Sequence, residues 1–304
     1  MQNLPSGDNE TAFALSTPQR WIEVGRDYLA LTKPGIVVWL MITAYCAMVV
    51  ASHGVPPWGV TLWTLGGLAV SAGGAHAVNM WYDRDIDQIM DRTKNRPVAS
   101  GRIPARRALA LGVAAGLVAF VLQATLVNWL TAWTCLGGYL VYVFVYTIWL
   151  KRRSPQNIVI GGAAGAFPPI VGWAAITDHL GLSAGLMFLL VFLWTPPHFW
   201  SLALYKQNDY RRAKIPMMPI VHGYRTTTIQ TLVYTALTVT TSVLLYRFAH
   251  LSWMYLGIAL AMGGTFLVYQ VRLLLALDQT GGWAKRNFKF SLLYIAVLFV
   301  AMVV

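Results

Sequence analysis

The chain has 304 residues, of which 57% are hydrophobic and only 11% are charged. Soluble domains are about 45–50% apolar and about 25% charged, so this composition excludes an ordinary soluble protein and predicts an all-α, polytopic membrane protein. The net charge is +12, but basic residues in a membrane protein first report the orientation of its helices, so the charge does not indicate nucleic-acid binding.

Apolar segments follow one another along almost the whole chain. Residues 1–20 form a polar tail, residues 21–31 are expected to form a short helix at the membrane surface, and residues 21–304 are expected to form one transmembrane domain. We expect nine transmembrane helices, because nine segments are long and apolar enough to cross a bilayer. These segments are 35–52, 58–80, 106–127, 129–150, 157–176, 183–205, 227–246, 251–276 and 287–304.

The basic residues gather in alternate loops. With nine spans, all of the 23 lysines and arginines except Arg247 fall on one side of the membrane. The positive-inside rule places that side in the cytoplasm. We therefore expect a bacterial inner-membrane protein whose N-terminus is cytoplasmic and whose C-terminus lies on the outer side.

Carboxylates gather where the second span meets a basic loop. Residues four apart lie on nearly the same face of a helix, so Asn79, Asp83 and Asp87 form one stripe of oxygen ligands, whereas Asp85 points away. Carboxylates at this spacing repel one another unless a cation binds between them. Mg²⁺ prefers oxygen ligands and is usually bound by one or two carboxylates together with substrate phosphates, so the stripe predicts a magnesium site.

Basic residues follow the stripe directly, at Arg92, Lys94 and Arg96. This order suits a magnesium–diphosphate complex, because the acids hold the metal and the bases neutralise the phosphate oxygens of the leaving group. A helix end with a merely topological basic tail would explain the bases but not the acids beside them.

A single acid, Asp209, follows the sixth span and precedes Arg211 and Arg212. Asp209 is a candidate to complete a metal–diphosphate clamp opposite the stripe, and the alternative is an ion pair with one of the two arginines. Asp278 lies in the eighth connection and is expected to be solvated.

Three further candidates lie within or at the end of apolar spans. His198 follows two prolines inside the sixth span; an imidazole there is a functional candidate by default, and the alternative is a hydrogen bond to a neighbouring helix. Tyr146 and Lys151 close the fourth span and are candidates to face a diphosphate. The alternative for Tyr146 is an aromatic residue at the membrane interface, and the alternative for Lys151 is a lysine that only sets the orientation of the helices.

These residues together resemble the UbiA superfamily of intramembrane prenyltransferases. The superfamily signature is matched at every specified position by Asn79-x3-Asp83-x2-Ile86-Asp87-x2-Met90-x-Arg92-Thr93-x2-Arg96-x4-Gly101. The segments 150–162, 195–200, 209–212 and 215–219 resemble the branch that farnesylates protoheme IX. The similarity covers roughly residues 25 to 300, and it departs from the superfamily pattern at Tyr205, where a second acid usually precedes Asp209.

The resemblance implies a helical bundle around a central cavity open to the lipid, and farnesyl transfer from farnesyl diphosphate to heme B. Membrane lipid surrounds such an enzyme, and a heme-modifying enzyme or the terminal-oxidase assembly machinery would act downstream. The resemblance also implies roles for the candidate residues. The catalytic acids are Asp83, Asp87 and Asp209, which bind Mg²⁺ together with Asn79. The diphosphate is bound by Arg92, Lys94, Arg96, Lys151, Arg211 and Arg212, while Tyr146 faces the farnesyl group and His198 faces the heme.

Three alternatives remain open at this stage. An aromatic acid such as 4-hydroxybenzoate is another acceptor within the same superfamily, although residues 195–200 favour heme. A multi-pass transporter also carries acids within its membrane segments, but it would be expected to hold them near the midplane. A non-catalytic heme-binding assembly factor would leave the stripe unexplained.

Overall fold

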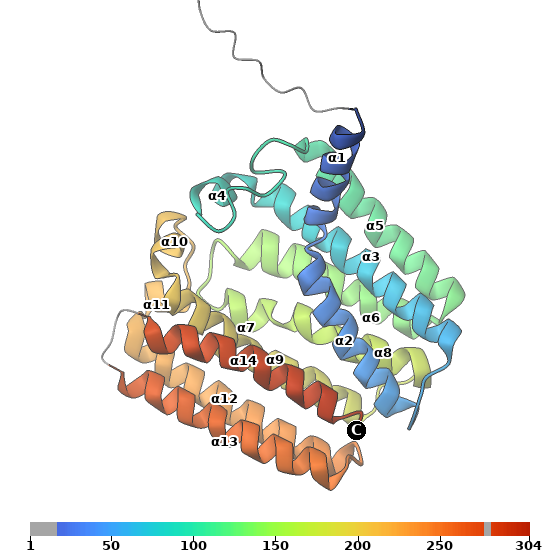
Figure 1. Ribbon diagram of the computed structural model, residues 1–304, viewed down its shortest axis with the longest axis vertical. Coiled ribbons are helices and arrows are strands. Elements are labelled where there is room, and N and C mark those ends of the chain that lie inside the picture. The colour runs from blue at the N-terminus through green and yellow to red at the C-terminus, as the bar shows by residue number, and fades with distance from the viewer. Residues whose placement is uncertain (1–16, 277–280) are drawn as a thin grey trace, which may run out of the picture.

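The computed structural model describes residues 17–276 and 281–304 (Figure 1). Across these residues the chain is helical and has no strand, which confirms the predicted all-α class. The predicted surface helix is α1 (Thr17–Leu31), so the last residues of the expected tail are helical. Residues 1–16 and Asp278 lie outside the described residues. The single-domain assignment and the central cavity stay predictions.

Helices occupy every segment that was expected to cross the membrane. They are α2 (Pro34–Ala51), α3 (Trp58–Tyr82), α5 (Ala105–Leu126), α6 (Trp129–Leu140) continued by η1 (Val141–Leu150), α7 (Asn157–Gly161) followed by α8 (Ala163–Thr177), α9 (Leu182–Tyr205), α12 (Gly223–Phe248), α13 (Trp253–Leu275) and α14 (Gly282–Ala301).

Within the described residues, seven of these helical segments are long and apolar enough to span a membrane, and α3 and α14 are not among them. The expected count of nine spans is therefore not confirmed. The first half of α14 carries Lys285, Arg286 and Lys289, and α3 is rich in glycine and polar residues. Both helices nevertheless pack within the bundle, α3 against α5 and α14 against α9 and α13.

The short helices gather at one end of the bundle. In Figure 1, α4 (Arg84–Ile89), α10 (Gln207–Arg212) and α11 (Met218–Val221) lie at the upper left, and the C-terminus lies at the opposite end. A cluster of buried apolar residues that includes Ile86, Trp200 and Met218 joins α4 to α9 and α11. The loops after α3 and α9 therefore meet, which brings the two acidic segments of the sequence to the same end.

The helix that follows α6 and contacts α3 has wider turns than an α-helix. Residues 141–150 form a π-helix, a conformation that occurs frequently at functional sites. Tyr146 packs tightly against Gly161, because a Cβ atom at that glycine would lie 2.3 Å from the tyrosine ring. Glycine at position 161 therefore allows the aromatic side chain to occupy this place beside α7.

Candidate active site

The three stripe residues lie on one buried face at the junction of α3 and α4. The backbone N–H of Asp83 donates to the carbonyl of Asn79 (2.9 Å), and that of Asp87 donates to the carbonyl of Asp83 (2.8 Å). The helical register thus continues through the junction, and all three side chains are at most 2% exposed. Asp85 points outward as expected and pairs with Arg152 (2.6 Å), whose hydrogen bond lowers the pKa of this carboxyl.

Each buried carboxylate has a basic partner. The Lys151 ammonium donates to Asp83 Oδ2, which also accepts from Asn79 Nδ2 (2.7 Å). Arg96 Nη1 donates to both oxygens of Asp87, at 2.9 and 2.8 Å. The structure thus brings Lys151 and Arg96 to the stripe as ion-pair partners of its acids. Their predicted role as diphosphate ligands stays a prediction.

Lys33 also reaches the stripe, although the sequence indicated only a topological role for it. Lys33 lies between α1 and α2, and its ammonium donates to Asn79 Oδ1 (3.0 Å) and to the Tyr142 hydroxyl (3.5 Å). Burial, together with the positive charges of Arg96 and Lys151, lowers its pKa well below the usual value. Its φ of 51° is left-handed, which is costly before a proline such as Pro34. Such backbone strain often marks a functional site.

The other predicted phosphate ligands are placed differently. Lys94 is about half-exposed and pairs with Asp91 (3.1 Å), so it does not reach the stripe. Arg92 is exposed and lies beside Tyr210, whose pKa is raised by burial and held down in part by this guanidinium. Tyr146 lies beside Tyr142, with ring centroids 5.6 Å apart.

Asp209 is held by an arginine that bridges two loops. Arg212 Nη2 donates to Asp209 Oδ1 (2.6 Å) and to Asp91 Oδ2. Among the described residues, no three His, Cys, Asp or Glu side chains are grouped closely enough to hold a metal ion. The structure thus contains the ion pair that was the alternative role for Asp209. The role of Asp209 as a metal ligand stays a prediction. A pocket of about 680 Å³ lies beside this ion pair, and it is lined by Asp91, Asp209 and Arg212 together with Arg211.

The bridge by Arg212 leads to a testable prediction. We expect Arg212→Gln to lower the melting temperature only slightly, because half of the Arg212 side chain and most of its partner Asp91 are exposed, so that solvent screens the interaction; Asp209 is the one buried partner. Hydrogen exchange should become faster in residues 207–212 and 91–96, since the two loops lose their shared cation. Arg211→Gln is the matched control and should leave both segments as they are. Equal exchange in the two variants would show that Arg212 does not join the loops.

His198 makes the hydrogen bond that was its alternative role. Its Nδ1 lies 2.8 Å from Ser291 Oγ, and its ring stacks between Trp194 and Phe288 at 4.4 and 4.6 Å. Because Ser291 Oγ donates its proton to the Phe288 carbonyl (2.7 Å), the serine oxygen accepts from a protonated Nδ1. Nε2 is then the nitrogen that retains a lone pair.

Comparison with known proteins places these residues in a family. Residues 40–293 match the UbiA prenyltransferase family. The chain belongs to that family. UbiA prenyltransferases are enzymes, and the seven apolar helical segments make this member a multi-pass membrane protein.

Relatives with curated names are similar over most of this UbiA prenyltransferase. A protoheme IX farnesyltransferase from Symbiobacterium thermophilum is 50% identical over 280 residues, which cover 92% of this chain and 94% of that protein. A protoheme IX farnesyltransferase from a Roseiflexus species is 50% identical over 279 residues, and this chain spans only 52% of its length.

Solved structures share the fold of this chain. A digeranylgeranylglyceryl phosphate synthase superposes with a TM-score of 0.78 at 17% identity, over 92% of this chain and 98% of its own. A UbiA homologue from Archaeoglobus fulgidus, bound to GPP and Mg²⁺, superposes with a TM-score of 0.61 at 18% identity, over 91% of this chain and 100% of its own.

Proposed function

We propose that this enzyme transfers the farnesyl group of farnesyl diphosphate to a vinyl group of protoheme IX, with addition of water and release of diphosphate. The observation that carries the proposal is the buried cluster in which Asp83 and Asp87 face Lys151 and Arg96. The chain bearing this cluster is 50% identical over most of its length to a protoheme IX farnesyltransferase.

The donor atoms fit a hard divalent cation. Asp83 Oδ1 is buried and accepts no hydrogen bond, although the Arg152 guanidinium lies 3.7 Å from it. The side chains of the stripe offer carboxylate and amide oxygens, which Mg²⁺ prefers. Asn79, Asp83 and Asp87 would hold the ion, and phosphate oxygens of the substrate would complete its shell; Asp209 is the candidate fourth ligand. When bound, the metal neutralises charge on the leaving diphosphate.

The basic residues would bind the rest of the diphosphate. Lys151 and Arg96 form ion pairs with Asp83 and Asp87. Their positive charges would therefore lie close to the leaving diphosphate, on which negative charge develops. We add Lys33 to this group, because its ammonium points into the cluster and has only neutral side chains as hydrogen-bond partners. Arg92, Lys94, Arg211 and Arg212 remain proposed ligands that would contact substrate from the loops.

The reaction balances without a covalent enzyme intermediate. The allylic C–O bond breaks, and its electron pair leaves with diphosphate. The terminal vinyl carbon of the heme then bonds to the farnesyl carbon, and the cation formed beside the porphyrin ring takes a hydroxyl from water, releasing one proton. Tyr146 is the proposed stabiliser of the allylic cation through its ring face, and the surrounding bundle would limit access of bulk water.

His198 is the proposed heme contact. A histidine that ligates a metal usually donates its other N–H to a neighbouring group, and Nδ1 donates in this way to Ser291. We further propose that the enzyme lies in a bacterial inner membrane with the α4 and α10 end in the cytoplasm, and that its product passes to a heme-modifying enzyme or to oxidase assembly.

The acceptor and the metal are tested together. The purified protein is incubated with farnesyl diphosphate and Mg²⁺, plus either protoheme IX or 4-hydroxybenzoate, and diphosphate release and prenylated product are followed. Release is expected only with protoheme IX. Removing divalent ions with EDTA should stop it, and excess Mg²⁺ should restore it. Prenylation of 4-hydroxybenzoate alone would assign the enzyme to the aromatic-acid branch, and full activity in EDTA would exclude the metal role.

A further inference from the structure

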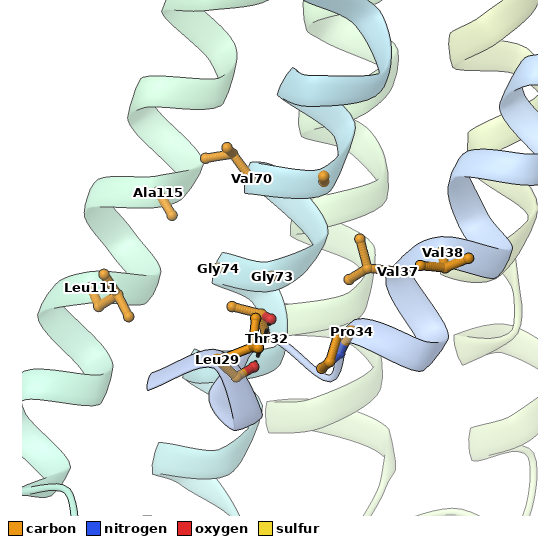
Figure 2. A pocket seen from close by; sticks show the side chains of 11 residues that line it. Leu29, Thr32, Pro34, Val37, Val38, Val70, Gly73, Gly74, Leu111 and Ala115 are labelled. Atoms are coloured by element: carbon orange, nitrogen blue, oxygen red, sulfur yellow. Dashed lines mark hydrogen bonds between the residues drawn. The ribbon is translucent and has the colours of Figure 1, made fainter. Parts of the chain in front are cut away.

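An apolar groove lies on the outer face of the bundle, and none of the residues of the candidate active site lines it. It has a volume of about 400 Å³, within the range of about 300–1,000 Å³ of ordinary ligand pockets. Figure 2 shows α5 on one side, α2 on the other and α3 between them, with Leu29 and Thr32 of the α1 end closing the groove. Gly73 and Gly74 line the groove from α3, and they let α3 approach its neighbours closely, because a Cβ atom there would lie 3.1 Å from Thr32 and 2.7 Å from Ala115.

The groove is separate from the active site on α3. Asn79 and His76 of that helix bond to Lys33, Thr147 and Tyr142 on the inner side, whereas the groove is lined by residues 69, 70, 73 and 74. Thr32 and Pro34 line the groove while Lys33, between them, turns inward. The short segment 32–34 is therefore shared by the two sites.

The walls of the groove are exposed hydrocarbon. Leu29, Val38 and Leu111 are 58%, 52% and 38% exposed. In a membrane-spanning bundle this face meets lipid acyl chains, and a hollow in it would be filled by one of them.

Two arginines each precede a groove-lining residue by about one helical turn. Arg107, Leu111 and Ala115 lie at positions i, i+4 and i+8 of α5, and Arg26 precedes Leu29 by three positions in α1, so each arginine shares a helix face with groove-lining residues. Both arginines are exposed, and neither has an ion pair or hydrogen bond among the described side chains. The groove thus combines an apolar channel with two unpaired positive charges.

We propose that this groove binds an anionic phospholipid, with an acyl chain between α2 and α5 and the phosphate between Arg26 and Arg107. Charge complementarity favours this occupant, because basic residues at the membrane surface attract anionic headgroups. The prenyl donor also has an apolar tail and a phosphate head, but the active-site bases Lys33, Arg96 and Lys151 bond to the stripe and none of them lines the groove. A zwitterionic lipid would leave the arginines uncompensated.

Adjacent residues supply matched controls. Arg106 and Val113 are exposed like Arg107 but lie on the opposite side of α5 from Leu111 and Ala115. The delipidated full-length protein in detergent is titrated with phosphatidylglycerol or phosphatidylcholine of identical acyl chains, and bound lipid is counted by native mass spectrometry. We expect one retained phosphatidylglycerol in the wild type, in Arg106→Gln and in Val113→Phe.

The double variant Arg26→Gln/Arg107→Gln should bind phosphatidylglycerol roughly 30-fold more weakly, and Ala115→Phe, which fills the groove, should lose it. Both arginines are exposed, so the double variant should keep the wild-type melting temperature in lipid-free detergent. Equal binding of the two lipids, unchanged binding in the double variant, or displacement of the lipid by farnesyl diphosphate would each overturn the proposal. The measurement needs no turnover, so it is independent of the proposed reaction.

Discussion

Asp83→Asn is expected to reduce farnesyl transfer by at least about 10²–10³-fold, the loss that follows removal of one charge-stabilising group from a reaction centre. Asp83 is fully buried, and the substitution keeps its shape while removing the charge that would hold the metal. It also leaves Lys151 without its anion, and breaking a buried ion pair from one side costs up to about 3–5 kcal/mol. A lower melting temperature should therefore accompany the loss of activity.

A second substitution separates these two effects. In Asp83→Asn/Lys151→Met the unpaired ammonium is absent, so most of the lost stability should return, but activity should not. Thermal unfolding and product formation are measured on the single and double variants. If restoring stability also restored turnover, Asp83 would be a structural residue. Substantial activity in Asp83→Asn at saturating Mg²⁺ would contradict the metal assignment.

Lys33→Met is expected to raise the KM for farnesyl diphosphate and to lower kcat/KM by about 10²-fold, because one donor to the diphosphate is lost. Stability should change little. Methionine removes the cost of burying an ammonium, which offsets the hydrogen bond that Asn79 Oδ1 loses.

The matched variant is Lys33→Arg, which keeps the charge. It should retain more activity than Lys33→Met, although a guanidinium is larger than the space that the ammonium occupies. The decisive comparison is between steady-state kinetics and melting temperature. A variant that loses stability and keeps its KM for farnesyl diphosphate would show that Lys33 only stabilises the connection between α1 and α2.

The features that local sequence could predict are those set by helix periodicity. The common face of Asn79, Asp83 and Asp87 follows from residues four apart, and the backbone hydrogen bonds carry that register across the end of α3. The boundaries expected for the apolar segments also lie within a few residues of the observed helix ends. The count of spans was less secure, because α3 and α14 gain their place in the bundle from packing rather than from apolar composition.

The features that the sequence could not supply depend on distant contacts. Lys33 meets Asn79 from 46 positions away, and in the sequence it looked like a topological lysine. The bridge from Arg212 to Asp91 spans 121 positions, so the partner of Asp209 could only be left open. His198 likewise finds Ser291 across 93 positions. In each case the side chain's role follows from which helices pack together, and no local pattern encodes that.

The most direct test of the proposed reaction is the mass of the heme product formed by the purified protein with farnesyl diphosphate, protoheme IX and Mg²⁺. The wild type should give heme increased by one farnesyl group and one hydroxyl group, and Asp83→Asn should give unmodified heme. Two results would contradict a farnesyl transfer that depends on the buried cluster at the α3–α4 junction. One is unmodified heme from a wild type that releases diphosphate, and the other is the same farnesylated product from both proteins.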